Sequence, residues 1–162
     1  MKLTAAVITV SDSCHGAMRE DLSGPRLQSC LREAGFEIGL TGLIPDDVEQ
    51  IAAAIRACAA EARFVVTTGG TGIAARDVTP EATVKVCDRL LPGIAEQIRS
   101  EGLKQTPYAA LSRGVCGTLG QSLVLNLPGS PAGAEASLKS VLHLIPHALD
   151  LLEGKTEHSS GS

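Results

Sequence analysis

The sequence predicts an α/β domain of three layers, in which a mostly parallel sheet is flanked by helices. Short runs rich in β-branched and aromatic residues alternate along the chain with segments whose apolar residues recur at helical spacing. The run at 122–127 is almost continuously apolar, which is typical of a strand buried on both faces. The chain has 162 residues, enough for one domain with a complete core. We therefore expect one domain over residues 1–154 and a polar, flexible tail over residues 155–162.

Strands are expected at residues 3–10, 36–44, 64–66 and 122–127, with an irregular strand or hairpin over the glycine-rich stretch 114–120. The first helix is expected to be capped by Ser23 or Gly24, to have Pro25 in its first turn and to end at Gly35. The last helix contains Pro146, which predicts a kink or a restart of the helix at that point.

The helix after the second strand follows Pro45-Asp46-Asp47, and its apolar positions run from Val48 to Ala62. One Asp suffices as an N-cap. Asp46 and Asp47 therefore either share the capping, or one of them turns its carboxylate toward a ligand at the strand end. The motif alone favours neither interpretation.

A further helix is expected to have Thr79 at its N-cap and Pro80 at its first position. Its predicted buried positions are Val84, Cys87, Leu90 and Leu91. Pro92-Gly93 should break this helix, and Gly102 should break the helical segment that follows. A turn is expected at residues 105–107.

The chain is organised around the stretch 64–83, in which Gly69-Gly70-Thr71-Gly72 directly follows a strand. Glycine backbone can adopt positive φ and approach a ligand closely, which a Cβ would prevent. Arg76-Asp77 lies between these glycines and the next helix. A strand, a glycine loop, a charged pair and a helix start together predict a phosphate-binding site with a carboxylate beside it.

Other polar residues follow the predicted strands, and the carboxyl ends of strands are where open α/β sheets bind ligands. Ser11-Asp12 follows the first strand, Asp46 the second, and Pro128-Gly129-Ser130 the last. We expect these segments and the glycine loop to converge on one rim of the sheet. An ordinary turn with side-chain to backbone bonds is the alternative interpretation of the segment at Ser11.

Composition excludes several classes of protein. The formal net charge is −4 and no basic cluster occurs, which disfavours nucleic acid or an anionic membrane as a partner. The chain has no Trp, one Tyr and two Phe, too few for a platform on which bases stack. Five widely spaced cysteines without a CxxC pair suggest neither a zinc site nor a disulfide framework. The first residues do not resemble a signal peptide, so we expect a cytoplasmic protein.

Two common glycine motifs do not fit the loop. A P-loop requires a Lys-Ser/Thr pair after its glycines, and the loop is followed by none. Gly70, Gly72 and Ala75 match a loose dinucleotide fingerprint, but Arg76-Asp77 separates them from the helix. No acidic residue ends a second strand about 20 residues further on, where a ribose contact would require it.

TTGGTGIAARDVTPEAT, together with VSD, DLSGP, IPD, LSR and NLPGSP in this order, resembles the molybdenum cofactor biosynthesis family. The resemblance covers residues 6–152 and is greatest to molybdopterin adenylyltransferases, including the corresponding domains of gephyrin and its plant counterparts. It implies the fold of that family, a homotrimer, and transfer of AMP from Mg-ATP to the terminal phosphate of molybdopterin. It also implies a molybdate-inserting partner enzyme that takes the product.

By this resemblance, the functional acidic residues fall on Asp46 and Asp77, which we assign jointly to catalysis and to Mg²⁺ without dividing their roles. A carboxylate is a hard oxygen ligand suited to that ion. A plain salt bridge between Arg76 and Asp77 is the alternative interpretation of that pair. The expected substrate-binding residues are Ser11, Asp12, Gly69, Gly70, Thr71, Gly72, Arg76, Thr79, Glu81, Ser112, Arg113, Pro128, Gly129 and Ser130.

The sequence departs from the family at positions where its members commonly carry a basic residue. Leu119, Gln121 and Ala132 are uncharged here, which leaves Arg76 and Arg113 as candidate cations for the pterin phosphate. A pterin-binding carrier without catalytic activity is the main alternative function. A scaffold domain is a further alternative, disfavoured because no linker or second domain is evident.

Overall fold

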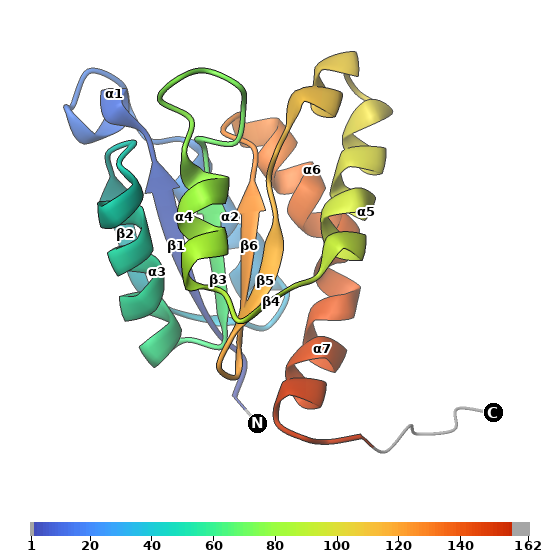
Figure 1. The fold of residues 1–162 in the computed structure, drawn as a ribbon. Coiled ribbons are helices and arrows are strands. Elements are labelled where there is room, and N and C mark those ends of the chain that lie inside the picture. The colour runs from blue at the N-terminus through green and yellow to red at the C-terminus, as the bar shows by residue number, and fades with distance from the viewer. Residues whose placement is uncertain (1, 157–162) are drawn as a thin grey trace.

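The computed structural model describes residues 2–156 as a six-stranded sheet with helices on both faces (Figure 1). The strand order is β2-β1-β3-β6-β5-β4. The strands are β1 (Thr4–Val10), β2 (Glu37–Ile44), β3 (Phe64–Thr68), β4 (Arg89–Leu90), β5 (Cys116–Leu119) and β6 (Ser122–Leu127). From β2 to β6 neighbouring strands are parallel, and β5 and β4 add an antiparallel edge. The predicted mostly parallel sheet is confirmed.

Helices cover the two faces of the sheet unequally, which completes the three layers. The helical elements are α1 (Asp12–His15), α2 (Ser23–Glu33), α3 (Val48–Glu61), α4 (Thr79–Val86), α5 (Pro92–Leu103), η1 (Pro107–Leu111), α6 (Pro131–Val141), η2 (Leu142–Leu144) and α7 (Ile145–Leu152). Apolar residues of α2, α5, α6 and α7 form one core with the sheet, and those of α3 and α4 form the other.

The central strands are buried on both faces because their successive side chains enter different cores. Val65 on β3 packs with α3 and α4, whereas its neighbours Phe64 and Val66 pack with the opposite layer. All six residues of β6 are buried, as the continuous apolar run predicts.

Two helix starts differ from prediction because the expected residues do not cap them. The residue before α2 is Leu22, not Ser23 or Gly24, and the Gly24 amide donates to Oδ1 of Asp21 at 3.0 Å. The residue before α4 is Val78, and no side-chain hydrogen bond caps that helix. Thr79 lies inside the first turn, where its hydroxyl donates to the Gly69 carbonyl instead.

The expected course of the chain after α4 is also wrong in detail. Val84 is exposed although it lies within α4. Leu90 is exposed because α4 ends at Val86 and the chain turns into the edge strand β4. Pro92 begins α5 instead of only ending the helix before it, and Gly102 lies within α5. As predicted, the helix restarts at Pro146: α6 is followed by the short η2 segment, and Pro146 lies in the first turn of α7.

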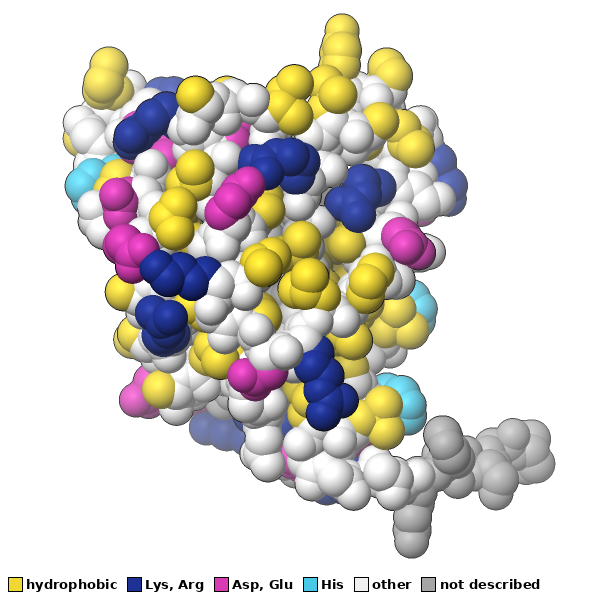
Figure 2. All heavy atoms as spheres, in the orientation of Figure 1, with side chains coloured by type: hydrophobic (Ala, Val, Ile, Leu, Met, Phe, Trp, Pro, Cys, Tyr) yellow, Lys and Arg dark blue, Asp and Glu magenta, His cyan; other side chains and the backbone are white. Residues whose placement is uncertain are grey.

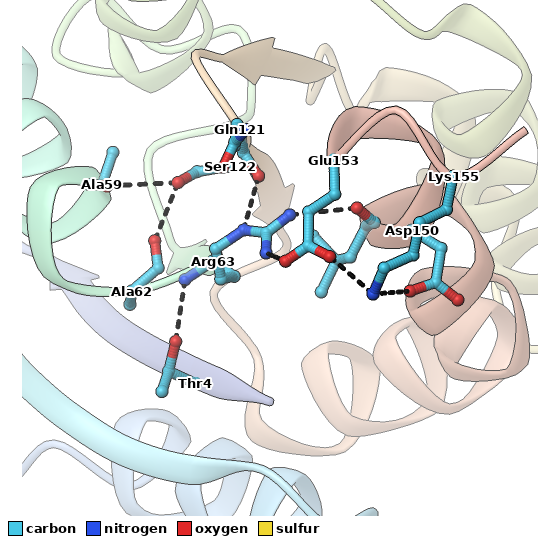
Figure 3. Close-up of polar contacts among 10 residues, drawn as sticks. Thr4, Ala59, Ala62, Arg63, Gln121, Ser122, Asp150, Glu153 and Lys155 are labelled. Carbon is cyan, nitrogen blue, oxygen red and sulfur yellow. Dashed lines mark hydrogen bonds and ion pairs between the residues drawn. The ribbon is translucent and has the colours of Figure 1, made fainter. Parts of the chain in front are cut away.

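Arg63 joins the amino end of β3 to the end of α7 (Figure 3). Its guanidinium donates to the carbonyls of Gln121, at 2.8 Å, and Leu149, at 3.0 Å, and pairs with Glu153. Lys155 contacts the same Glu153 carboxylate at 2.7 Å. Residues 155 and 156 of the predicted tail are described, and its remainder lies outside the described residues.

Replacing Arg63 should therefore destabilise the whole domain. We expect Arg63→Met to lower the free energy of unfolding by about 2–4 kcal/mol, because it removes the charged hydrogen bonds to the Gln121 and Leu149 carbonyls. Lys2→Met, which breaks an exposed ion pair with Glu37, should cost no more than about 0.5 kcal/mol. Urea unfolding measures both, and equal stabilities of the two variants would contradict a role for Arg63 in holding α7.

Candidate active site

The glycine loop follows β3 and adopts a backbone that only glycine accommodates. Gly69 has φ +98° and Gly70 has φ +68°. A Cβ at Gly69 would lie 2.3 Å from the carbonyl oxygen of Val10, and one at Gly70 would lie 2.3 Å from Oγ1 of Thr79. The expectation of positive φ is confirmed at these positions. Gly72 lies outside the left-handed region, so positive φ does not explain the glycine there; an added Cβ would instead lie 2.7 Å from Oδ2 of Asp77.

A buried hydrogen-bond network fixes the loop to the sheet. The Thr79 hydroxyl donates to the Gly69 carbonyl at 3.0 Å, and the Thr83 hydroxyl donates to the Thr79 carbonyl at 2.9 Å. The side-chain amide of Asn126 on β6 donates to the hydroxyls of Thr83 and Thr67. Sequence reasoning did not identify Asn126, although an amide within an otherwise apolar strand is a signal for such a network.

The two neighbouring aspartates before α3 have different roles. The Asp47 carboxylate accepts from the Gln50 amide at 2.9 Å and caps the helix. Asp46 instead turns to the end of β1, where its Oδ2 accepts from the Asp12 amide at 2.9 Å. The Asp46 amide donates in return to Oδ1 of Asp12, also at 2.9 Å. Of the two open interpretations, the structure supports the one in which Asp46 faces the site.

The charged residues of the 71–77 loop also have separate partners. Arg76 donates two bonds to the Asp12 carboxylate, at 2.9 and 3.0 Å. In the part of the chain that the structure describes, Arg76 thus pairs with Asp12 rather than with Asp77. The Asp77 carboxylate accepts from the Ala74 amide at 3.0 Å, which closes a turn within the loop.

Asp46 and Asp77 both line a polar cavity of about 510 Å³ at the carboxyl ends of the parallel strands. Its wall also includes Thr9, Val10, Ser11, Cys14, Arg19, Glu20, Asp21, Leu22, Ser23, Thr68, Gly69, Gly70, Gly129, Ser130 and Pro131. The ends of β1, β2, β3 and β6 thus meet at one rim, as expected. Among these residues, sequence reasoning did not propose Arg19, Glu20 and Asp21 as part of the site.

A second cavity of about 400 Å³ lies on the other side of the glycine loop and is mainly apolar. It lies between the loop, α5, η1 and the start of α6, and its members include Thr71, Gly72, Ser112, Pro128 and Ser130. Ser130 lines both cavities. Figure 2 shows hydrophobic side chains over the upper ends of α5 and η1, where Tyr108 is 76% exposed. The sequence predicted only a turn at residues 105–107, and it did not indicate this cavity.

Burial and neighbouring charges shift the pKa values of two carboxyl groups in the site, those of Asp46 and Asp12. Burial raises the pKa of Asp46 above its usual value, and the neighbouring carboxylates of Asp12 and Asp77 raise it further. Hydrogen bonds from Arg76 and from the Asp46 amide lower the pKa of Asp12. The site therefore combines one carboxylate that takes up a proton readily with another that keeps its charge in acid.

The oxygens of Asp46 and Asp77 suit a hard cation. Within residues 2–156, no group of three or more His, Cys, Asp or Glu side chains is placed to hold a metal by itself. Mg²⁺, however, is commonly bound by one or two carboxylates together with waters and substrate phosphates. Two carboxylates that face a polar cavity beside glycine backbone fit that mode of binding.

Two of the predicted binding residues, Arg113 and Glu81, have side chains that are already paired with other groups of the protein. Arg113 donates to the carbonyls of Gly72, at 2.7 Å, and Asp77, at 2.8 Å. Glu81 pairs with the same guanidinium. Gly129 lies beside Gly69, and a Cβ on it would be in van der Waals contact with the Gly69 Cα at 3.4 Å.

Open α/β sheets bind ligands outside the carboxyl ends of their strands, and the rim described here lies at that position. The fold and the site thus define an α/β domain with a candidate ligand site beside a glycine loop. The family described as "Probable molybdopterin binding domain" matches residues 6–147. The chain belongs to that family.

Similar proteins agree with this membership. A molybdopterin adenylyltransferase from Helicobacter pylori is 40% identical over 154 residues, which cover 91% of this chain and 86% of that protein. The molybdenum cofactor synthesis protein cinnamon of Drosophila melanogaster is 40% identical over 153 residues. That match covers 93% of this chain but only 26% of the fly protein, so the chain corresponds to about a quarter of it.

Solved structures show the same fold. The molybdopterin biosynthesis enzyme MoaB from Thermus thermophilus superposes with a TM-score of 0.88 at 44% identity. The superposition covers 94% of this chain and 98% of the other. Over residues 2–156, no helix is long and apolar enough to span a membrane.

Proposed function

We propose that this chain is a molybdopterin adenylyltransferase, which transfers AMP from ATP to the terminal phosphate of molybdopterin. The observation that carries the proposal is the pair of carboxylates, Asp46 and Asp77, that faces one polar cavity beside the glycine loop. The names of similar bacterial proteins support the same activity. They also favour catalysis over the alternative of a molybdopterin carrier.

In this reaction an oxygen of the molybdopterin phosphate attacks the α-phosphorus of ATP. A new P–O bond forms, the bond from the α-phosphorus to the bridging oxygen breaks, and pyrophosphate leaves with the electron pair. Negative charge spreads over phosphate oxygens in the transition state, so fixed N–H donors and a cation lower the barrier. Gly69 and Gly70 line the polar cavity, and the Gly69 amide already donates to the Leu127 carbonyl at 3.1 Å. We therefore assign this role to the loop amides from Gly70 onward.

Mg²⁺ is part of the proposal, with Asp46 and Asp77 as its joint protein ligands. Bound there with the phosphates of ATP, the ion would neutralise charge on the leaving pyrophosphate. Asp12 holds Asp46 through reciprocal backbone contacts, and Ala74 holds Asp77. These contacts restrict both carboxylates before a ligand arrives, which limits the reorganisation that the reaction needs.

We propose that the two substrates lie on either side of the glycine loop, since cavities flank it and share Ser130. The proposed binding groups are the backbone and hydroxyls of Ser11, Gly69, Gly70, Thr71, Gly72, Ser112, Pro128, Gly129 and Ser130. Asp12, Thr79 and Glu81 support this set through their contacts with Arg76, Gly69 and Arg113. Arg76 is an exposed cation paired with the Asp12 carboxylate, and an incoming phosphate could draw it away from Asp12.

The proposal also includes a molybdate-inserting enzyme as the partner that takes the adenylylated product. A cytoplasmic location suits the free thiols of the five cysteines, which a reducing compartment maintains.

One assay tests the proposed function directly. Purified chain, molybdopterin and Mg-ATP should release pyrophosphate and form adenylylated molybdopterin in equal amounts. Pyrophosphate should not form when either substrate is omitted. Tight molybdopterin binding without any pyrophosphate release would instead identify a carrier.

The raised pKa of Asp46 predicts how transfer depends on pH. As pH falls, Asp46 gains a proton earlier than an ordinary aspartate and loses the charge that the proposal requires, so kcat/KM should fall. Arg76→Met removes a positive charge that lowers this pKa, so the acid limb should move to higher pH. Arg26→Met, in an exposed pair with Glu135, should leave the limb in place. A limb that moves to lower pH in Arg76→Met would contradict the assignment.

We further propose a homotrimer. Several large apolar side chains are exposed on the single chain, among them Leu40, Leu43, Val84 and Leu90, and subunit contacts would bury part of this area. Light scattering of the purified chain at micromolar concentration should give the mass of three chains. A stable monomer under these conditions would count against the proposal.

A further inference from the structure

The segment from Thr71 to Asp77 carries a proposed catalytic carboxylate, yet it contains no helix or strand. Within it, the Asp77 amide donates to the Ala74 carbonyl at 2.9 Å, and the Ala74 amide donates to the Asp77 carboxylate at 3.0 Å. These bonds shape a turn but do not attach it to the rest of the domain. Arg76, within the segment, ties it to Asp12 beside the end of β1. The position of Asp77 depends, in addition, on what holds the two ends of the segment.

Arg113 contacts both ends at once. Its Nε donates to the Gly72 carbonyl at 2.7 Å, and its Nη2 donates to the Asp77 carbonyl at 2.8 Å. Its backbone amide donates to the Thr71 carbonyl at 2.8 Å. The remaining side-chain nitrogen, Nη1, pairs with the Glu81 carboxylate on α4. The planar guanidinium thus spans the loop from Gly72 to Asp77 as a fork that a lysine cannot reproduce.

The segment that carries Arg113 is itself held from the other side. Arg99 on α5 donates to the carbonyl of Gly114 at 2.9 Å. The Gly114 amide contacts the Ser112 hydroxyl at 3.3 Å. A continuous set of contacts therefore leads from α5 through residues 112–114 to the loop. Such support from residues that do not touch the reacting atoms is what keeps a catalytic group in place.

We propose that Arg113, oriented by Glu81, is a positioning residue: it sets the Asp77 carboxylate by clamping the carbonyls of Gly72 and Asp77, rather than neutralising a substrate phosphate. This inference rests on the proposed function and deepens it. All three nitrogens of the guanidinium already face acceptors of the protein, so a phosphate would have to displace one of them. Glu81 keeps its charge in this arrangement, because the hydrogen bond from Arg113 lowers its pKa.

Substitution by lysine separates the two roles. A phosphate-binding cation acts through its charge, which Arg113→Lys retains, whereas a fork between two carbonyls acts through its shape. Arg113→Lys and Arg113→Met should therefore lower kcat alike, by about 10- to 100-fold, the scale of a small misplacement of a catalytic group. KM for ATP and for molybdopterin should change by less than about threefold. Glu81→Gln should show a smaller loss of the same kind, and Arg26→Met should match the parent.

Hydrogen exchange gives a readout that does not depend on activity. If Arg113 clamps the loop, the amides of Ala74 and Asp77 should exchange faster in Arg113→Lys than in the parent, while those of the buried strand β6 should not. Near-parental kcat in Arg113→Lys with a raised KM in Arg113→Met would overturn the proposal in favour of a phosphate-binding cation. Unchanged exchange at Ala74 and Asp77 would overturn it as well. If the parent transfers no AMP, the proposed function fails, whereas the exchange data still decide whether Arg113 sets the loop.

Discussion

Asp77→Asn is expected to lower the rate of AMP transfer by a factor on the order of 10² or more, the scale for losing a group that stabilises transition-state charge. The substitution removes the negative charge while leaving an oxygen that can still accept from the Ala74 amide. The turn should therefore persist, and the melting temperature should stay close to that of the parent. Pyrophosphate release at saturating Mg-ATP measures the effect.

Asp47→Asn is the matched control for this substitution. It makes the same change of charge one residue from Asp46, but at a side chain that only caps α3. Asn is as good an N-cap as Asp, so neither turnover nor stability should change appreciably. Turnover of Asp77→Asn equal to that of Asp47→Asn would remove Asp77 from the catalytic assignment.

Gly72→Ala is expected to lower transfer by about 10- to 100-fold through the position of Asp77 rather than through the backbone. Gly72 lies outside the left-handed region, so alanine fits its backbone conformation. An added Cβ would, however, lie 2.7 Å from Oδ2 of Asp77, and the carboxylate must move to accommodate it. The free energy of unfolding should change by no more than about 1 kcal/mol, because the obstructing atom belongs to a side chain.

Gly35→Ala provides the opposite pattern. Gly35 has φ +92° and no atom within 4 Å of the added Cβ, so the substitution strains the backbone without obstructing anything. It should lower the free energy of unfolding by about 1 kcal/mol and leave transfer unchanged. Melting of the ligand-free variants and pyrophosphate release together distinguish the two glycines. Full activity in Gly72→Ala would show that the Asp77 carboxylate tolerates the shift and that its position is not critical.

The layers, the sheet and the place of the site follow from local patterns in the sequence. Apolar periodicity predicts which segments are strands and helices, and the carboxyl ends of parallel strands must share one edge of a sheet. Those rules place Asp46 beside the glycine loop although 22 residues or more separate them in the chain. The convergence of Ser11, Asp46 and Gly129 on one cavity was predictable for the same reason.

Contacts between side chains distant in sequence were not predictable in this way. The pairing of Arg76 with Asp12 depends on how the 71–77 loop folds back over the end of β1, which no local pattern encodes. Thr79 looks like an N-cap in the sequence, because its hydroxyl is suited to that task and Pro80 follows it. In the structure this hydroxyl donates to the Gly69 carbonyl instead of capping the helix. The role of Asn126 depends in the same way on threonines from β3 and α4.

The order of strands has a consequence for how the chain acquires its site during synthesis. The polar cavity is bounded by residues as early as Thr9 and as late as Pro131, and its central strand β3 pairs with β6. A nascent chain that ends before β6 therefore has the glycine loop but lacks Asn126, which secures that loop to the sheet. Parallel pairing between segments so distant in sequence is slow, because the intervening chain must first be ordered. We therefore expect the proposed nucleotide binding only in the completed domain, and a ligand at 100 times its Kd would stabilise the folded chain by about 2.7 kcal/mol.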